Sequence, residues 1–373
     1  MHILRVANFV SPTSGGIKTA LRHWGQLYQQ AGHRASLIIP GPGPEISEEE
    51  QGLVYRVPAR PVPGTGYSLM WSRVGLARLM DAIAPDALEV SDRSTTRWMG
   101  RWARRRGIGS VMISHENMTG IMVRRTPVPE RPSHWAADVI NRLSAHDYDA
   151  IVCPSRFAAE EFHRNGLAAE VVPLGVDVDV FTPVRELTDG PVPGQDGPIR
   201  LAHCSRLSRE KNPALSIETV RELVRRGHEV ELTVFGAGPM LDELVARARN
   251  LPVTFHSYIT DRRELAAELG RADLAISPGP LETFGLAALE ILACGIPVVC
   301  CDEGALHEVV GDGGVVKPST PAAFADGVEE LLRRRHARAR ARAAAERFSW
   351  PVSAGRMLEV HAAVAAGRAG PRD

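Results

Sequence analysis

The sequence lacks any long apolar run. No segment approaches the roughly eighteen consecutive apolar residues that a membrane-spanning helix requires. Residues 1–10 are strand-like and show no charged leader followed by an apolar helix and a small-residue cleavage site. We therefore expect a cytoplasmic protein that does not span a membrane.

Cysteine is scarce, and its five residues cannot all pair within one chain. They form no C-x-x-C motif and have no histidine at a metal-ligand spacing. This pattern argues against a disulfide framework and against a structural metal site. We expect reduced, mostly buried thiols.

The chain also lacks an excess of charge of either sign. Forty-four basic residues balance forty-four acidic ones, so no overall field favours nucleic acid as a partner. Lysine is rare, because the basic residues include only Lys18, Lys211 and Lys317. Two of these lysines fall in segments that have the character of phosphate-binding loops.

The 373 residues are enough for two domains of roughly 150 to 200 residues each. Short apolar runs alternate with amphipathic stretches in both halves, which is typical of parallel β-α repeats. We predict an α/β fold with two Rossmann-like, doubly wound sheets. Ligands bind beyond the carboxyl ends of such strands, so two facing sheets would form a cleft.

The clearest linker is L-T-D-G-P-V-P-G-Q-D-G-P at residues 187–198, which contains three glycines and three prolines. It separates a predicted N-terminal domain at 1–186 from a predicted C-terminal domain at 199–349. A long Ala- and Arg-rich helical tail is predicted from Pro321 onward. We expect residues 350–373 to cross back to the N-terminal domain.

The strongest motif is P-G-P-L-E-T-F-G-L-A-A-L-E at residues 278–290, between a predicted strand and a predicted helix. Glu282 lies in the turn, and the following amides are expected at the helix N-terminus, where they suit a phosphate or sugar hydroxyls. Glu290 follows eight residues later, so a rise of ~1.5 Å per residue separates the two carboxylates by about 12 Å. The two catalytic carboxylates of a glycosidase lie roughly 5 to 9.5 Å apart, so this spacing is too wide for a glycosidase pair. The backbone amides expected at the helix N-terminus are those of Thr283, Phe284, Gly285 and Leu286.

The stretch L-E-T-F-G-L-A-A-L-E-I-L-A-C-G-I-P-V-V at 281–299 resembles the donor-binding signature of family 4 of the retaining glycosyltransferases, whose fold is GT-B. The resemblance spans nearly the whole chain, as far as F-S-W at 348–350. It implies that Glu282 contacts hydroxyls of the donor hexose and that Glu290 holds the ribose of a nucleotide sugar. It also implies that the domain at 1–186 lies on the acceptor side and that the domain at 199–349 binds the nucleotide sugar. It implies no cofactor.

The segment H-C-S-R-L-S-R-E-K-N-P at 203–213 resembles the phosphate-binding segment of the same family. The resemblance places Arg206 and Lys211 on the pyrophosphate. Two cations there would stabilise the charge that grows on the leaving diphosphate. Both residues are therefore counted, with Glu282, among the catalytic candidates.

A glycine turn, S-P-T-S-G-G-I-K-T-A, follows the first predicted strand. Gly15 and Gly16 allow the backbone to approach a phosphate closely, and the resemblance assigns them to the donor phosphate or the acceptor. The spacing matches neither the dinucleotide fingerprint nor the P-loop, which argues against an oxidoreductase. With only three lysines, a phosphorylase that needs a pyridoxal-phosphate lysine is also disfavoured.

Three further polar residues complete the candidate site. His115 follows the strand V-M-I-S, and the resemblance implies that it contacts the donor hexose as a catalytic or acceptor-side residue. The alternative is a histidine satisfied by backbone groups. Asp92, in E-V-S-D-R, is a weaker candidate for acceptor contact. Asp261, in I-T-D-R-R, lies where related enzymes read the base, and its carboxylate can accept from guanine N–H groups, which points to GDP.

The sequence D-V-D at 177–179 superficially matches the metal-binding D-x-D of other glycosyltransferases. It lies in V-P-L-G-V-D-V-D-V-F, which resembles the family's domain-crossover segment. We therefore expect a structural role for Asp177 and Asp179, no metal site, and activity without a divalent ion.

Within the family, the stretches E-V-S-D-R, V-M-I-S-H-E and C-P-S-R-F-A-A-E-E-F resemble actinobacterial mannosyltransferases that use GDP-mannose to build phosphatidylinositol mannosides and related glycolipids. This implies transfer of mannose, with retention, to a lipid-linked or other hydroxyl acceptor. The segment at 121–132 departs from the pattern on the acceptor side. The alternatives are an enzyme that uses a UDP-sugar and a soluble acceptor, and a non-catalytic nucleotide-sugar-binding protein.

Residues 94–107, S-T-T-R-W-M-G-R-W-A-R-R-R-G, predict a basic helix on which Trp98 and Trp102 share a face. Arginines attract anionic lipid and tryptophan suits the headgroup boundary, so one interpretation of the pattern is a peripheral contact with the inner membrane face. The alternative is that both tryptophans form the face that a Rossmann helix buries on its sheet.

Overall fold

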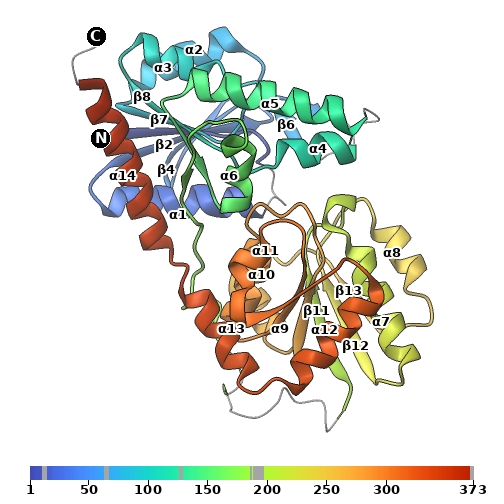
Figure 1. The fold of residues 1–373 in the computed structure, drawn as a ribbon. Coiled ribbons are helices and arrows are strands. Elements are labelled where there is room, and N and C mark those ends of the chain that lie inside the picture. The colour runs from blue at the N-terminus through green and yellow to red at the C-terminus, as the bar shows by residue number, and fades with distance from the viewer. Residues whose placement is uncertain (11–14, 63–66, 126–128, 185–186, 188–196, 370–373) are drawn as a thin grey trace. The chain divides into compact units, whose positions relative to one another are not determined.

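A computed structural model describes residues 1–373 with the exception of 11–14, 63–66, 126–128, 185–186, 188–196 and 370–373 (Figure 1). The chain divides into two compact units. The first comprises Met1–Gly175 and Trp350–Asp373, and the second comprises Val176–Ser349. Each unit has its own mainly parallel sheet, as the alternating β-α pattern predicts.

The first unit contains an eight-stranded sheet in the order β10-β9-β8-β7-β1-β2-β4-β3. Neighbouring strands pair in parallel, except that β3 and β4 are antiparallel. A two-stranded sheet pairs β5 with β6. The strands are β1 (His2–Val6), β2 (Arg34–Gly41), β3 (Glu45–Glu49), β4 (Gly52–Pro58), β5 (Arg60–Val62), β6 (Tyr67–Leu69), β7 (Ala87–Val90), β8 (Gly109–Ile113), β9 (Ala150–Cys153) and β10 (Glu170–Val171).

The helices of the first unit connect these strands and include the last helix of the chain. They are α1 (Gly16–Gln30), α2 (Arg73–Ile83), α3 (Met99–Arg105), α4 (Met118–Arg125), α5 (Glu130–Asp147), α6 (Arg156–His163) and α14 (Trp350–Ala369). Helix α14 lies beside α1 (Figure 1). Trp24 Nε1 donates to Ser353 Oγ at 3.0 Å, and the rings of His23 and Trp350 stack at 4.5 Å. These contacts hold α14 within the first unit.

The second unit contains a six-stranded parallel sheet in the order β13-β12-β11-β14-β15-β16. The strands are β11 (Ile199–Cys204), β12 (Val230–Phe235), β13 (Val253–His256), β14 (Leu274–Ser277), β15 (Val298–Cys301) and β16 (Gly314–Lys317). The helices are α7 (Pro213–Arg225), α8 (Leu241–Arg247), α9 (Arg262–Leu269), α10 (Leu286–Ala293), α11 (Leu306–Val310), α12 (Pro321–Arg333) and α13 (Ala337–Glu346), with 3-10 turns η1 (Arg209–Lys211) and η2 (Gly311–Gly313).

Strand β15 is apolar along its whole length, as expected of an interior strand in a parallel sheet that helices cover on both faces. All four residues of β15 are buried, including Cys300 and Cys301. Burial raises the pKa of Cys300 to about 12, so this thiol stays protonated at neutral pH. Each of the five cysteines is free, and four of them are buried, which confirms the expected thiols.

The domain boundary differs from the expectation at residue 186, because residues 176–184 lie with the second unit. Phe181 is 1% exposed there, and Arg342 Nη1 of α13 donates to its carbonyl oxygen at 2.8 Å. The predicted linker at 187–198 lies mostly outside the described residues. The predicted continuous helical tail is instead α12, α13 and α14, since the left-handed conformation of His336, with φ +56°, separates the first two.

Candidate functional site

The turn between β14 and α10 holds Glu282 in a fixed backbone conformation. Gly285 caps α10 with φ +96°, and a Cβ there would approach Leu306 Cδ2 to 2.3 Å, so only glycine fits. The carbonyl of Glu282 accepts a hydrogen bond from Ala305 N at 2.8 Å. The turn is therefore tied to the segment that precedes α11, and the Glu282 side chain is left half-buried.

Helix α10 begins later than the sequence analysis expected. Gly285 is its cap and Leu286 its first residue, so Thr283 and Phe284 precede the helix. Phe284 is 3% exposed and packs edge-to-face on Phe348 at 5.6 Å. The expectation that all four amides form the helix N-terminus is therefore wrong for Thr283 and Phe284, because the left-handed glycine sets the start of the helix.

Glu282 and Lys211 form an ion pair in the second unit. Lys211 Nζ donates to Glu282 Oε1 at 2.7 Å, and their side chains are 25% and 20% exposed. Lys211 ends η1, and the left-handed Asn212 then starts α7. The pair brings together two motifs that are 71 residues apart in the sequence. Both side chains keep enough exposure to meet a ligand.

Arg206 lies on the same β11–α7 connection as Lys211. Its Nη2 atom pairs with Glu210 four residues later, and both side chains are partly exposed. Leu207, between the two cations, is fully buried. Leu207 thus packs the connection into the core, while Arg206 and Lys211 leave a guanidinium and an ammonium partly exposed. Two cationic groups on one connection suit an anionic ligand.

Glu290 is buried in α10 and pairs with Arg262, the first residue of α9. The guanidinium of Arg262 also lies over the Phe181 ring at 4.7 Å from its centroid. Burial acts to lower the pKa of Arg262, but the charge of Glu290 and its hydrogen bond outweigh burial and raise it. Sequence analysis quoted the segment that contains Arg262 but gave this residue no role.

Asp261 caps helix α9. Its carboxylate accepts from Arg263 N at 2.8 Å and from Glu264 N at 3.4 Å, and the residue is exposed. Both bonds use Oδ1, as expected of an N-cap. The described contacts leave Oδ2 accessible, so the cap is compatible with the expected contact to a base.

Gly15 and Gly16 form the start of α1. Gly15 is the cap residue, and its carbonyl accepts from Thr19 N at 3.0 Å. A Cβ placed on Gly15 would meet no atom within 4 Å. The remaining residues of the predicted turn, 11–14, lie outside the described residues.

His115 lies on the loop between β8 and α4, half-buried, with its ring 6.1 Å from that of Trp24. Burial lowers its pKa to about 4, although the Glu89 carboxylate acts in the opposite direction. The imidazole is therefore neutral at neutral pH, and a neutral imidazole can donate from one ring nitrogen and accept at the other.

Asp92 is 5% exposed and organises the turn after β7. One of its oxygens accepts from Ser94 N at 2.9 Å and Ser94 Oγ at 2.6 Å. The other accepts from Asn8 Nδ2 and Thr96 Oγ1, each at 2.8 Å. These bonds use both oxygens, so the geometry favours a structural role over the expected acceptor contact.

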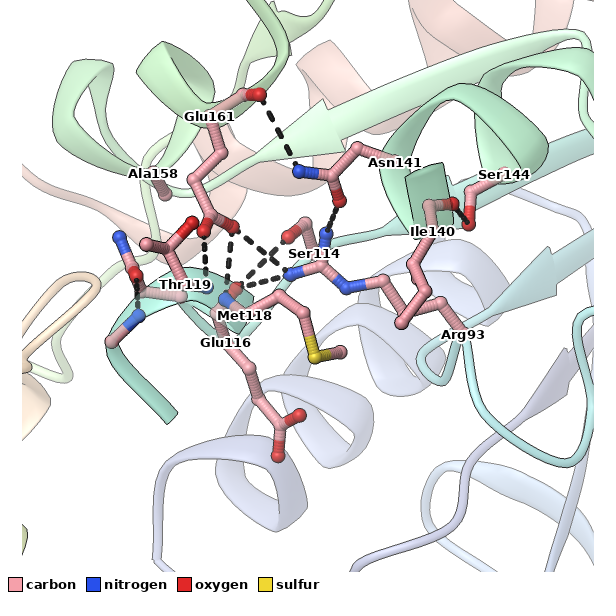
Figure 2. A network of polar contacts seen from close by, with 12 residues as sticks. Arg93, Ser114, Glu116, Met118, Thr119, Ile140, Asn141, Ser144, Ala158 and Glu161 are labelled. Carbon is pink, nitrogen blue, oxygen red and sulfur yellow. Dashed lines mark hydrogen bonds and ion pairs between the residues drawn. The ribbon is translucent and has the colours of Figure 1, made fainter. Parts of the chain in front are cut away.

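Arg93, the next residue, joins a buried network that sequence analysis missed (Figure 2). Its guanidinium meets Glu161 of α6, Asn141 of α5 and the carbonyl oxygen of Glu116. Glu161 also accepts from backbone amides at the start of α4. The partners are distant in sequence, and no local spacing signals them.

Trp98 and Trp102 pack on the protein core, as the second of the two interpretations predicts, and do not face a membrane. Trp102 is 5% exposed in the core, and Trp98 packs against the same cluster. The turn organised by Asp92 precedes helix α3, which begins at Met99, and four of the five nearby arginines have protein partners. Arg97 and Arg101 pair with Asp147, Arg106 pairs with Asp81, and Arg104 donates to the His146 carbonyl. Among the described residues, no helix has the length and apolar character needed to cross a bilayer.

Asp177 of the D-V-D sequence turns the backbone, because its Oδ1 accepts from Asp179 N at 3.1 Å and Val180 N at 3.2 Å. In the described part of the chain, no three His, Cys, Asp or Glu side chains gather in a metal-like cluster.

We predict that turnover survives an excess of EDTA, because Asp177 serves the fold and cationic side chains are available for phosphate charge. Initial rates with and without chelator provide the measurement. Loss of turnover that Mn²⁺ or Mg²⁺ restores would contradict this prediction.

Comparisons with known proteins identify relatives along the whole chain. The family model described as glycosyl transferases group 1 matches residues 188–348, and the glycosyl transferase 4-like domain matches residues 15–175. The GDP-mannose-dependent alpha-(1-6)-phosphatidylinositol dimannoside mannosyltransferase of Mycobacterium tuberculosis is 40% identical over 98% of this chain and 97% of that protein. A D-inositol 3-phosphate glycosyltransferase of Xylanimonas cellulosilytica is 35% identical over 57% of each chain.

Solved structures show the same fold at low sequence identity. Sucrose-phosphate synthase from Thermosynechococcus elongatus superposes with a TM-score of 0.75 at 19% identity, covering 98% of this chain and all of the other. HepE of Anabaena in complex with UDP-glucose gives 0.73 at 17% identity, covering 97% and 100%. With the near full-length 40% identity, these likenesses show that the chain is a GT-B enzyme of the group 1 glycosyl transferases, a hexosyltransferase.

Proposed function

We propose that this enzyme transfers mannose from GDP-mannose to a lipid-linked acceptor with retention of anomeric configuration. The observation that carries the proposal is the 40% identity, over nearly the full length of both chains, to a GDP-mannose-dependent phosphatidylinositol dimannoside mannosyltransferase. The lipid acceptor would bring the enzyme to a membrane surface as a peripheral protein. Trp98 and Trp102 do not supply that contact, since Trp102 lies in the core and Trp98 packs against it.

In this proposal the donor binds the second unit at the turn before α10. Arg206 and Lys211 hold the diphosphate, Glu282 accepts from hexose hydroxyls, and Glu290 accepts from the ribose. The Lys211–Glu282 ion pair supports this assignment, because it brings a cation suited to phosphate within 2.7 Å of a carboxylate suited to sugar hydroxyls, and a nucleotide sugar joins those two groups directly. Gly285 and Leu286 offer backbone amides at the start of α10.

In the first unit, His115 contacts the transferred hexose as a neutral hydrogen-bonding group, and Gly15 and Gly16 bring backbone close to phosphate or acceptor. The acceptor hydroxyl attacks the anomeric carbon on the face from which the diphosphate leaves. The bond from that carbon to the phosphate oxygen breaks, and the hydroxyl proton passes to the departing oxygen. Arg206 and Lys211 stabilise the charge on that oxygen, which is the main electrostatic demand of the step.

The direct test is product analysis with purified enzyme. We expect mannose to pass from GDP-mannose to a phosphatidylinositol mannoside acceptor, with mass spectrometry showing the gain of one hexose. Transfer from a UDP-sugar to a soluble acceptor would instead support the alternative enzyme. Binding of nucleotide sugar without turnover on any acceptor would support a non-catalytic protein.

We further predict that GDP binds more tightly than UDP. Asp261 supports this expectation, because it is an exposed carboxylate with one oxygen outside its cap bonds and can accept from guanine N–H groups. Calorimetry with GDP and with UDP measures the difference in affinity between them, and Asp261→Ala should make that difference smaller. Tighter binding of UDP by the wild type would overturn the guanine assignment and, with it, the choice of mannose.

A further inference from the structure

A buried ion pair lies beside the loop that carries His115 (Figure 2). Arg93 Nη2 and Glu161 Oε2 are 3.4 Å apart, and the two side chains are only 4% and 2% exposed. Removing two charges from water is costly, and such pairs often add nothing to stability compared with apolar residues. Stability alone therefore gives little reason for this pair.

The pair fastens the loop between β8 and α4 at its far end. Arg93 Nη2 donates to the carbonyl oxygen of Glu116, which also accepts from Ser114 Oγ at 3.2 Å. Glu161 accepts from Met118 N at 2.9 Å and Thr119 N at 2.6 Å, one bond to each carboxylate oxygen. Strand β8 holds the near end, so the backbone on both sides of His115 is fixed.

Asn141 fixes the orientation of the guanidinium. Its Oδ1 accepts from Arg93 Nη1 at 2.5 Å, while its Nδ2 donates to the Glu161 carbonyl at 3.4 Å. The guanidinium also lies over the Phe162 ring at 5.5 Å. A planar fork can satisfy Asn141, Glu161 and the loop carbonyl together, whereas the single ammonium of a lysine cannot reproduce that geometry.

We propose that Arg93 and Glu161 are positioning residues that hold the loop of residues 114–119 so that His115 meets the transferred sugar. This inference rests on the proposed role of His115 and adds residues that touch no substrate. A displacement of about 1 Å at a reacting group can cost ~100-fold in rate. The bonds to Glu116, Met118 and Thr119 prevent such a displacement.

The test uses Arg93→Lys and Glu161→Gln, which keep the positive charge and the side-chain shape, respectively. We expect each variant to lower kcat about ten-fold, an effect within the range of misplaced groups, with the Kd for GDP changed less than about two-fold. The matched control is Asp147→Asn in the same unit. Asp147 is 1% exposed and pairs with Arg97, but it lies before β9, at the amino edge of the sheet.

A double-mutant cycle separates positioning from general destabilisation. In a His115→Ala background, Arg93→Lys should change kcat less than about two-fold, because the group that it positions is gone. A ten-fold loss in both backgrounds, or in the Asp147→Asn control, would overturn the proposal. If Arg93→Lys does not give a native circular dichroism spectrum, the same double-mutant cycle with Glu161→Gln and His115→Ala tests the proposal.

Hydrogen exchange measured by mass spectrometry gives a readout that needs no substrate. The amides of residues 114–119 should exchange at least about ten-fold faster in Arg93→Lys and Glu161→Gln than in the wild type. Unchanged exchange sinks the positioning role even if the enzyme transfers mannose. Faster exchange in an enzyme whose wild type transfers no mannose would show that the network holds the loop and that the proposed function has failed.

Discussion

Lys211→Met should lower turnover by about 100-fold or more, a loss of ~2.7 kcal/mol in transition-state stabilisation. The ammonium of Lys211 is the proposed partner of the charge that develops on the leaving diphosphate, and methionine keeps most of the side-chain volume. Glu282 would also lose its cation at 2.7 Å, so its hold on the hexose should weaken. Single-turnover rates at saturating donor measure the chemical step directly.

Lys317→Met is the matched control. Lys317 Nζ donates to Glu330 at 2.8 Å and is 24% exposed, close to the 2.7 Å and 25% of Lys211, but it ends β16. This variant should keep turnover within about two-fold, since an exposed pair of this kind contributes only ~0–1 kcal/mol. Similar rates for Lys211→Met and the wild type would remove Lys211 from the reaction.

The fold was predictable because its signals are local. Short apolar runs that alternate with amphipathic stretches predicted two mainly parallel sheets, and each unit contains one. The turn that carries Glu282 was also predictable, because a predicted strand ends before it and a predicted helix follows, although α10 begins later than expected. These features depend on residues that are close together in the sequence.

The burial of Trp98 and Trp102 could not be decided from the sequence. Their i, i+4 spacing places both on one helix face but does not say whether a sheet or a solvent boundary covers that face. In the structure this face packs on the core, and nearby arginines pair with Asp81 and Asp147, which are distant in the sequence. Asp92 shows the same limit, because a strand-end carboxylate has the same sequence signal whether it binds a ligand or caps a turn.

Ion pairs between residues that are distant in the sequence could not be predicted either. Glu290 meets Arg262, 28 residues away, and Arg93 meets Glu161, 68 residues away. Propensity and periodicity describe one element at a time, whereas these pairs depend on which elements the sheet topology brings together. The family resemblance could therefore give Glu290 a ribose contact, but no local pattern identified Arg262 as its partner.

Glu290→Gln should remove most of the enzyme's discrimination between GDP and 2′-deoxy-GDP. If the carboxylate accepts from the ribose, the wild type should bind GDP roughly 10- to 100-fold more tightly than the deoxy analogue, because a hydrogen bond to a charged group contributes ~1.5–3 kcal/mol. With glutamine the ratio should fall to about two, since a neutral acceptor contributes less. Calorimetry with both ligands on each protein gives the ratio.

The ratio is informative because it compares two ligands on one protein. Glu290 is buried and paired with Arg262, so its replacement also costs stability, and either affinity alone would mix that cost with the lost contact. Asp273→Asn supplies the control, because Asp273 is 1% exposed and pairs with Arg200 at 3.1 Å in the same unit, directly before β14. The Asp273→Asn variant should be less stable than the wild type but keep the wild-type ratio of affinities for GDP and 2′-deoxy-GDP. If Glu290→Gln keeps that ratio too, Glu290 serves only to hold Arg262, and the ribose must find its partner elsewhere.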